Sequence, residues 1–523
     1  MRRFFRKLFS PIALSAIFLV IEIILLVAVV MVFFFAIDYF TDVDNIFIFS
    51  LSRILVMIFD LIIFFHIVGK RENPEYKIPW IAFLLIFPHL TLVFYVFFAN
   101  HGVRRKDKRI IIPSNKIIKE KFALKDNEID EFREDVPIEY RTAFRYLRNV
   151  SFLHSTKNNQ ITYYKNGELF FPEFVESLKK AEKFIFMEFF IIGEGKWWSQ
   201  IESVLIEKAS QGVEVRLLYD DLGSFGLLPN NYPKKLRKKG IKCYKFHKIS
   251  PIISGAYNNR DHRKIAVIDH KEAYTGGMNL ADEYANDLKR FGYWKDTMIK
   301  IKGPGISNLI ATFLQNYDLS AKRVSNYDDF LDFPYDLYDE PGYIYSFGDG
   351  PGGYDNNQAI GEENYLNIIA RANRTLWIST PYFIPTYSLL EAVKNAAKRG
   401  VDVKLFLPGI PDKKIVYWMA KSEFANLLEA GVKVYIYTPG FNHEKQMVAD
   451  DVFAFCGTIN FDFRSLTHHF ECGATLYGVP CIKDMVEDFK EMESVSELVK
   501  KIKRPNLFKR IIVSVLKLIR TLL

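Results

Sequence analysis

The sequence carries the same short pattern twice, and this repetition constrains the fold more than any other feature. Each copy reads His-x-Lys with an Asp five residues after the Lys: His262, Lys264 and Asp269 in the first copy, and His443, Lys445 and Asp450 in the second. Each copy lies in a strand-like run and is followed by a glycine-containing turn that ends in an asparagine, Asn279 or Asn460. Two copies with matching sequels are not expected by chance, so the pattern indicates an internal duplication.

Other segments repeat in the same order along the chain. Residues 181–186 match 373–378, residues 211–217 match 399–405, and residues 239–244 match 430–435. In both halves, apolar runs rich in β-formers alternate with amphipathic stretches, which is typical of an α/β fold. We therefore predict two similar lobes, at 151–330 and 331–498, each a mixed sheet flanked by helices. A pseudo-twofold axis between them would bring the two motifs together at the lobe interface.

The first hundred residues are strongly hydrophobic. Three apolar runs, at 12–37, 46–68 and 79–99, each reach about the 20 residues that a helix needs to cross a bilayer. Residues 1–100 are therefore predicted to anchor the chain in the cell membrane as a multi-pass segment. Basic residues at the N-terminus, after the second run and after the third favour the inside face at all three places. Two crossings and one kinked, non-crossing segment satisfy this pattern and leave the lobes cytoplasmic.

Two charged segments flank the lobes. Residues 101–150 are highly charged and suit a linker with helical stretches, whereas residues 499–523 combine basic and apolar side chains at helical spacing. The tail is predicted to be a basic amphipathic helix on an anionic membrane, the alternative being a surface helix packed on the lobes. The net charge of +9 favours anionic partners, either phospholipid or nucleic acid. The four cysteines have neither C-x-x-C nor zinc-ligand spacing, so no disulfide framework or structural metal is predicted.

Paired histidines and lysines suit phosphoryl transfer through a covalent phosphohistidine. One imidazole attacks phosphorus, the other handles the proton of the leaving group, and the lysines neutralise the phosphate oxygens. Because two lysines supply the compensating charge, the mechanism needs no metal ion. The sequence also has no P-loop or dinucleotide fingerprint, so we expect no cofactor.

These motifs resemble the phospholipase D superfamily and, within it, bacterial cardiolipin synthases. The superfamily signature is the duplicated pattern with its glycine turn, and further segments are similar to those of the synthases: 219–224 (YDDLGS), 276–279 (GGMN), 294–296 (WKD), 380–385 (TPYFIP) and 460–465 (NFDFRS). The second motif departs from the usual pattern at Glu444, where a small residue is common, and at Thr458. The pair His468 and His469 also replaces part of the usual Asn-Phe-Glu ending.

The resemblance implies a reaction and a set of roles. His262 is assigned as the nucleophile that attacks phosphatidylglycerol, and His443 as the acid and base; a second phosphatidylglycerol then accepts the phosphatidyl group to give cardiolipin and glycerol. The phosphate-binding group would be Lys264, Lys445, Asn279 and Asn460. Two carboxylates, Asp296 and Glu471, are the expected partners of the histidine rings. Asp269 and Asp450 are expected to brace the motif strands and the lobe interface.

Two other classes of function use the same motif. A hydrolase of the phospholipase D type would pass the group to water and release phosphatidic acid, and a nuclease would cleave nucleic acid. We expect no nucleic-acid partner, because membrane runs flank the site. A scaffold with a decayed site is disfavoured by the intact His, Lys and Asn of both halves, and Glu444 is its only support. The expected partners are phosphatidylglycerol and anionic membrane lipid.

Overall fold

The protein is described by a computed structural model, which divides the chain into two compact units. The described residues are 46–71, 73–87, 90–91, 94–95, 98–99, 102–123, 136–249, 258–351, 359–501 and 507–521. One unit comprises Met1–Gly102, Ile249–Asn258 and Ser514–Leu523, and the other comprises Val103–Lys248 and Asn259–Val513. Both predicted lobes lie in the second unit, apart from residues 249–258 of the first lobe. The predicted membrane run at 12–37 falls outside the described residues.

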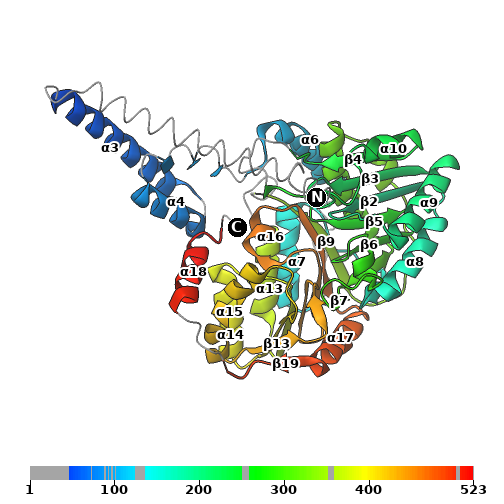
Figure 1. The fold of residues 1–523 in the computed structure, drawn as a ribbon. Coiled ribbons are helices and arrows are strands. Elements are labelled where there is room, and N and C mark those ends of the chain that lie inside the picture. The colour runs from blue at the N-terminus through cyan, green and yellow to red at the C-terminus, as the bar shows by residue number, and fades with distance from the viewer. Residues whose placement is uncertain are drawn as a thin grey trace, which may run out of the picture. The chain divides into compact units, whose positions relative to one another are not determined.

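The first lobe is a seven-stranded mixed sheet in the order β1-β8-β6-β5-β2-β3-β4 (Figure 1). Its strands are β1 Gln160–Tyr164, β2 Phe184–Phe189, β3 Glu214–Asp220, β4 Lys242–Phe246, β5 Lys264–Ile268, β6 Glu272–Gly276 and β8 Met298–Lys302. Strands β2, β3 and β4 are parallel and the remaining pairs are antiparallel. The helices of this lobe are α8 Gly167–Lys179, α9 Lys196–Ser210, α10 Tyr232–Lys238, η3 Asp282–Ala285, α11 Ile306–Ala321 and α12 Asp328–Leu331.

The second lobe repeats this topology and adds one edge strand. Its order is β19-β13-β12-β10-β15-β16-β18-β9, so that β10, β12 and β13 correspond to β2, β3 and β4, and β15 corresponds to β5. The strands are β9 Tyr343–Asp349, β10 Thr375–Ser379, β12 Asp402–Pro408, β13 Lys433–Tyr437, β15 Gln446–Ala449, β16 Phe453–Gly457, β18 Glu471–Tyr477 and β19 Ser496–Leu498. The helices are α13 Ile360–Arg371, α14 Tyr387–Lys398, α15 Lys414–Glu429, α16 Phe463–Thr467 and α17 Ile482–Ser494. The predicted duplicated α/β fold is confirmed.

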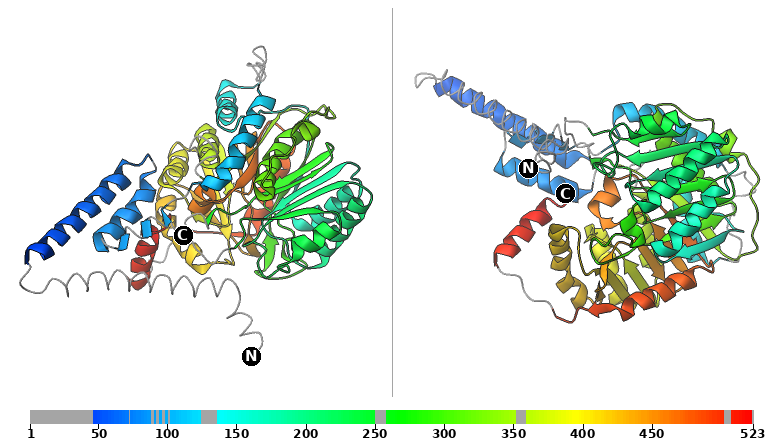
Figure 2. Two further views of the ribbon diagram at one scale, coloured as in Figure 1. Left: turned by 90° about the horizontal axis from the view of Figure 1, so that it is seen from above. Right: turned by 45° about the vertical axis from the view of Figure 1, so that its right-hand side comes forward.

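The strands of both sheets are apolar because both faces are covered. Every residue of β2 is buried, and its side chains alternate between two cores: Phe184 and Phe186 enter the larger one, Ile185 and Met187 the smaller. The smaller core lies under α8 and α9 on the outer face of the first sheet (Figure 2). The larger core runs continuously from the inner face of that sheet into the second lobe. Burial on both faces explains the absence of polar alternation in these runs.

The two lobes meet through short strands as well as through their sheets. Strand β7 (Tyr293–Lys295) of the first lobe pairs in parallel with β14 (Gly440–Asn442) of the second, and β6 contacts β16 and β18. A further short pair, β11 (Phe383–Ile384) with β17 (Phe461–Asp462), lies within the second lobe. The backbone of the motifs therefore takes part in the lobe interface.

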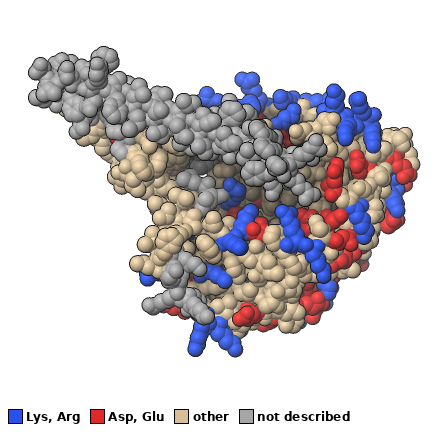
Figure 3. Space-filling model, in the orientation of Figure 1, with Lys and Arg blue, Asp and Glu red and all other residues tan. Residues whose placement is uncertain are grey.

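The charged segment before the first lobe is folded onto the core where it is described. Helices α6 (Arg105–Lys121) and α7 (Ile138–Ser151) contribute Ile111, Ile118 and Phe144 to the larger core. Beyond the lobes, α18 (Leu507–Leu518) carries exposed Leu507, Phe508 and other apolar residues together with basic ones. Basic and acidic side chains are interspersed over much of the face of the protein seen in Figure 3.

The N-terminal unit contains α3 (Ile46–Gly69) and α4 (Pro74–Ile86) among its described residues. These helices contact each other around Ile63, Ile67 and Trp80. Asn73 begins α4, since its side chain accepts a hydrogen bond from the Glu75 amide. Within the described part of the chain, no helix combines the length and the apolar character that a membrane crossing requires.

The aspartates of the two motifs occupy equivalent turns. Asp269 follows β5 and Asp450 follows β15, and both have a left-handed backbone with φ of 54°. The carboxylate of Asp269 accepts hydrogen bonds from the amides of residues 182–184 at 2.8–2.9 Å. That of Asp450 accepts from the amides of residues 373–375 at 2.7–2.9 Å. Each aspartate thus fastens the motif hairpin to the start of the neighbouring strand within its own lobe.

We predict that Asp269→Ala lowers the free energy of unfolding by about 1–3 kcal/mol, because it leaves backbone donors without acceptors. Asparagine at position 269 keeps one side-chain acceptor and adopts the left-handed backbone readily, so Asp269→Asn should lower the free energy of unfolding by less. Denaturant unfolding measures both effects. Turnover by Asp269→Asn well below its unfolding midpoint should stay close to that of the native protein, and a turnover loss as large as that of a histidine variant would show that this carboxylate takes part in the reaction.

Candidate active site

The backbone brings each motif histidine beside a strand of the other lobe. The His262 amide donates to the Phe470 carbonyl at 2.8 Å, and the His443 amide donates to the Lys295 carbonyl at 2.7 Å. The residue after each of these carbonyls is an acid, Glu471 or Asp296. Hydrogen bonding across the interface therefore sets each histidine next to a carboxylate of the opposite lobe.

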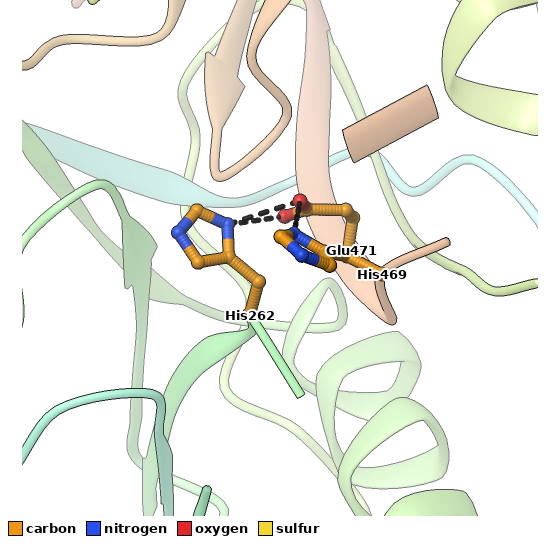
Figure 4. A group of neighbouring side chains, drawn as sticks. All are labelled: His262, His469 and Glu471. Atoms are coloured by element: carbon orange, nitrogen blue, oxygen red, sulfur yellow. Dashed lines mark hydrogen bonds and ion pairs between the residues drawn. The ribbon is translucent and has the colours of Figure 1, made fainter. Parts of the chain in front are cut away.

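The His262 ring is held by the second lobe. Its Nδ1 lies 2.8 and 3.0 Å from the two carboxylate oxygens of Glu471 (Figure 4). The Thr458 hydroxyl donates to the same carboxylate and also accepts from the Cys472 amide. Thr458, which departs from the family pattern, thus keeps Glu471 in place. In Figure 4 the second ring nitrogen of His262 points away from the carboxylate.

The His443 ring is held by the first lobe in the same way. Its Nδ1 lies 2.6 Å from Oδ2 of Asp296, and the other carboxylate oxygen accepts from the Thr297 amide at 2.9 Å. A Cβ on Gly277 would lie only 2.0 Å from the Asp296 carboxylate, so the glycine turn makes room for this acid. Lys445 Nζ also lies 2.8 Å from Nδ1, but a carboxylate only accepts, and we place the Nδ1 proton on the bond to Asp296.

Both histidines are neutral at ordinary pH in this setting. Burial, followed by the positive charges of Lys264 and Lys445, holds the pKa of His262 well below its usual value. Burial and Lys445 likewise lower the pKa of His443 to about 4, although Asp296 opposes the shift. A neutral ring that carries its proton on Nδ1 and donates it to a carboxylate has a free electron pair on Nε2. Each ring is therefore prepared either to attack or to take up a proton.

The motif lysines are fully enclosed in the same site. Lys264 Nζ donates to the carbonyl of His262 at 2.5 Å, and Lys445 Nζ donates to the carbonyl of His443. Burial lowers the pKa of Lys264 to about 7 and that of Lys445 to about 8. An anion entering the site would favour the charged form of both. The lysines are thus placed to hold phosphate oxygens.

The two turn asparagines are engaged with their own lobes. Asn279 accepts from the Ile191 amide at 2.9 Å and donates to the Tyr284 hydroxyl at 2.7 Å. Asn460 donates to the Ser465 hydroxyl at 2.9 Å. Each asparagine thus uses one amide hydrogen to fix the loop that follows its turn, which leaves the second as its possible contact with phosphate.

Glu444 points away from the histidines and takes part in a buried charge network. Its carboxylate lies 2.5 Å from Lys295 Nζ, which also contacts Asp488 at 2.7 Å. Gln446 and Ser379 donate to the same carboxylate at 3.0 Å. Although burial opposes it, the charges of Glu444 and Asp488 raise the pKa of Lys295. Glu444 therefore joins the lobes through Lys295. Within the part of the chain that the structure describes, it contacts neither histidine ring.

Two further site residues were not predicted from the sequence. Asp220, at the end of β3, is buried and accepts from the amide of Asp261, the residue before His262, at 3.0 Å. The His469 ring lies 5.3 Å from the His262 ring. In the sequence, Asp220 is signalled only by the YDDLGS segment that contains it. His469 is signalled only by its place in the segment that replaces the usual Asn-Phe-Glu ending.

Known family models match the two lobes and part of the N-terminal segment. The family described as "Cardiolipin synthase, PLD-like domain" matches residues 174–315 and 365–493, which cover the two motifs. The family described as "Phospholipase_D-nuclease N-terminal" matches residues 58–100.

Several proteins are similar over most of the chain. An uncharacterized protein of Streptococcus mutans is 40% identical to this chain. The matched region covers 88% of this chain and 99% of that protein. The cardiolipin synthase of Geobacillus kaustophilus is 35% identical, and the match covers 82% of this chain and 85% of that protein. Cardiolipin synthase 2 of Bacillus anthracis is 32% identical, and the match covers 87% of this chain and 88% of that protein. A solved phosphatidylserine synthase of Haemophilus influenzae shares the fold, with a TM-score of 0.56 at 15% identity, over 74% of this chain and all of its own.

We predict that Lys295→Met lowers the free energy of unfolding by about 3–5 kcal/mol, because it leaves two buried carboxylates without their cation. Glu444→Gln should lower the free energy of unfolding by less, since Lys295 keeps its ion pair with Asp488. Denaturant unfolding of the full-length variants gives both values. Equal losses for the two variants, or no loss for Lys295→Met, would contradict the description of Lys295 as the centre of this network.

Proposed function

We propose that this chain, which belongs to the phospholipase D-like cardiolipin synthase family, transfers a phosphatidyl group between two phosphatidylglycerol molecules. The products are cardiolipin and glycerol. The observation that carries the proposal is the crossed arrangement of the site, in which two neutral histidines are each held through Nδ1 by a carboxylate of the other lobe. Relatives whose names state cardiolipin synthase cover most of the chain and support the choice of reaction.

In the first half-reaction, Nε2 of His262 attacks the phosphorus of phosphatidylglycerol. A phosphorus–nitrogen bond forms, the bond between phosphorus and the glycerol oxygen breaks, and His443 donates a proton to the departing oxygen. His443 must first be protonated, and the negative phosphodiester beside it favours that form. The Nδ1 proton of His262 stays on the ring and is donated to the Glu471 carboxylate, which stabilises the positive ring during the attack.

In the second half-reaction, His443 takes the proton from a hydroxyl of another phosphatidylglycerol. That oxygen attacks phosphorus and the bond to His262 breaks, which gives cardiolipin and restores the neutral nucleophile. Lys264 and Lys445 stabilise the charge on the non-bridging oxygens in both steps. One phosphodiester is exchanged for another, so the reaction requires no nucleotide.

The assignment of roles to the two rings follows their electrostatics. Burial and the charges of Lys264 and Lys445 hold the pKa of His262 well below its usual value, whereas for His443 the carboxylate of Asp296 opposes the lowering by burial and Lys445. The charge of Asp296 favours the protonated form of His443, which suits a proton donor, whereas the lysine charges keep His262 neutral with the electron pair that attack on phosphorus requires. We therefore keep His262 as the nucleophile and His443 as the acid and base.

We predict that the purified protein converts labelled phosphatidylglycerol into cardiolipin and glycerol. His443→Ala should lower turnover by about 100- to 10,000-fold as expected for a general acid, and His262→Ala by more. His270→Ala is the control, because His270 bonds to the Phe330 carbonyl outside the site and should keep turnover. Phosphatidic acid as the sole product would favour the hydrolase, and near-normal turnover by either motif variant would contradict the two-histidine mechanism.

Membrane attachment through the N-terminal segment is the second part of the proposal. Helix α3 exposes a run of large apolar side chains, among them Leu55, Ile62 and Phe65. Contiguous apolar surface of this kind is typical of a contact with lipid or protein. Together with the apolar run at 12–37, it supports a multi-pass anchor in the cell membrane. The basic residues that follow the apolar runs favour the cytoplasmic side for the lobes.

The anchor predicts how the protein behaves when membranes are washed. A membrane-spanning chain should stay in the pellet in high salt and in alkaline carbonate, because hydrophobic insertion is not screened by ions. Western blotting of pellet and supernatant measures this. Release by salt alone would mean that only electrostatic attachment, such as that of the basic tail, holds the protein on the bilayer.

A further inference from the structure

A third imidazole stands beside the proposed nucleophile. His469 lies between α16 and β18, and its Nδ1 is 3.4 Å from Oε1 of Glu471 (Figure 4). Its side chain is 11% exposed, whereas that of Glu471 is fully buried. The proposed mechanism uses His262 and Glu471 but gives His469 no role.

The three side chains form a compact set of ligand atoms. One nitrogen from each imidazole and one carboxylate oxygen all lie within 4.8 Å of one another. Two histidines and one glutamate make up a common zinc site, in which a fourth position stays open. The Thr458 hydroxyl donates a hydrogen bond to the carboxylate, as outer partners of metal ligands do.

A metal ion needs the electron pair of one nitrogen from each imidazole, and the arrangement of the two rings around Glu471 brings one nitrogen of each to the site. The positive charges of Lys264 and Lys445 oppose a divalent ion, so the nitrogen ligands must outweigh this repulsion.

We propose that His262, His469 and Glu471 bind a divalent transition-metal ion such as Zn²⁺, and that this ion inhibits the enzyme. The site shares its nucleophile with the reaction, so the inhibitory part of the proposal rests on the proposed function. The ion acts as an inhibitor because it competes for the ring that must attack phosphorus.

Inhibition follows from the two tautomers of His262. In the active form the proton is on Nδ1, bonded to Glu471, and Nε2 carries the free electron pair. A metal bound at Nδ1 requires the pair of that nitrogen, so its proton leaves to water and Nε2 takes one up. The ring stays neutral, but the nucleophilic nitrogen now holds a proton. The bound ion also occupies the carboxylate that would stabilise the positive ring.

The test uses metal-free, full-length protein in detergent, with His469→Asn as the variant. Zn²⁺ is titrated into the cardiolipin-forming assay, and Co²⁺ is titrated separately, with binding followed by its visible absorption. His270→Asn is the matched control, since it removes a histidine outside the cluster. We expect Zn²⁺ to inhibit the native protein and the control with the same midpoint, and His469→Asn to need a concentration higher by about tenfold or more.

The cobalt measurement separates this proposal from the proposed function. Native protein and the control should give the visible band of a bound ion, and His469→Asn should lose it at the same concentration. If the native protein made no cardiolipin, the proposed function would fail, while the cobalt band would still establish the metal site. Equal inhibition of native protein and His469→Asn, or a band unaffected by the variant, would overturn the proposal.

Discussion

The structure depends on two hydrogen bonds that cross between its lobes, because each motif histidine is held by a carboxylate of the other lobe. His262 is oriented by Glu471, and His443 by Asp296. Neither lobe alone has an oriented histidine, so the duplication is required for function as well as for the fold. The same crossed bonds explain why the motif residues are buried at the interface and why short strands pair across it. A shift of one lobe by one residue would separate both rings from their acids.

Burial at the lobe interface makes the charges of this site effective. Lys264 and Lys445 are buried beside the histidine rings and their carboxylates, and burial lowers the pKa of both lysines. A phosphodiester that enters adds negative charge next to both lysines and favours their charged forms. Charge is stabilised best by groups that are fixed before the reaction, because they need no rearrangement during it. Behind the site, Lys295 and Glu444 form a second pair that joins the lobes without touching the rings.

The sequence predicted the parts of this account that are local or repeated. The two motifs, the matching segments of each half and their apolar runs predicted the duplicated α/β fold, and the glycine turns placed Asn279 and Asn460. The crossing of the carboxylates was beyond prediction, since it depends on the register of β7 with β14 for Asp296 and on the bridge between Asp261 and Phe470 for Glu471. The role of Glu444 was hidden for the same reason: its partner Lys295 is distant in the chain and meets it only when the lobes pack.

The most direct test of the account is to trap the covalent intermediate. Rapid acid-free quenching during turnover of phosphatidylglycerol, followed by mass spectrometry of the digested protein, locates any phosphatidyl group on the chain. We expect an adduct on His262 and none in His262→Ala with any substrate. Complete absence of an adduct during active turnover would contradict the account, because direct displacement between the two lipids needs no phosphohistidine.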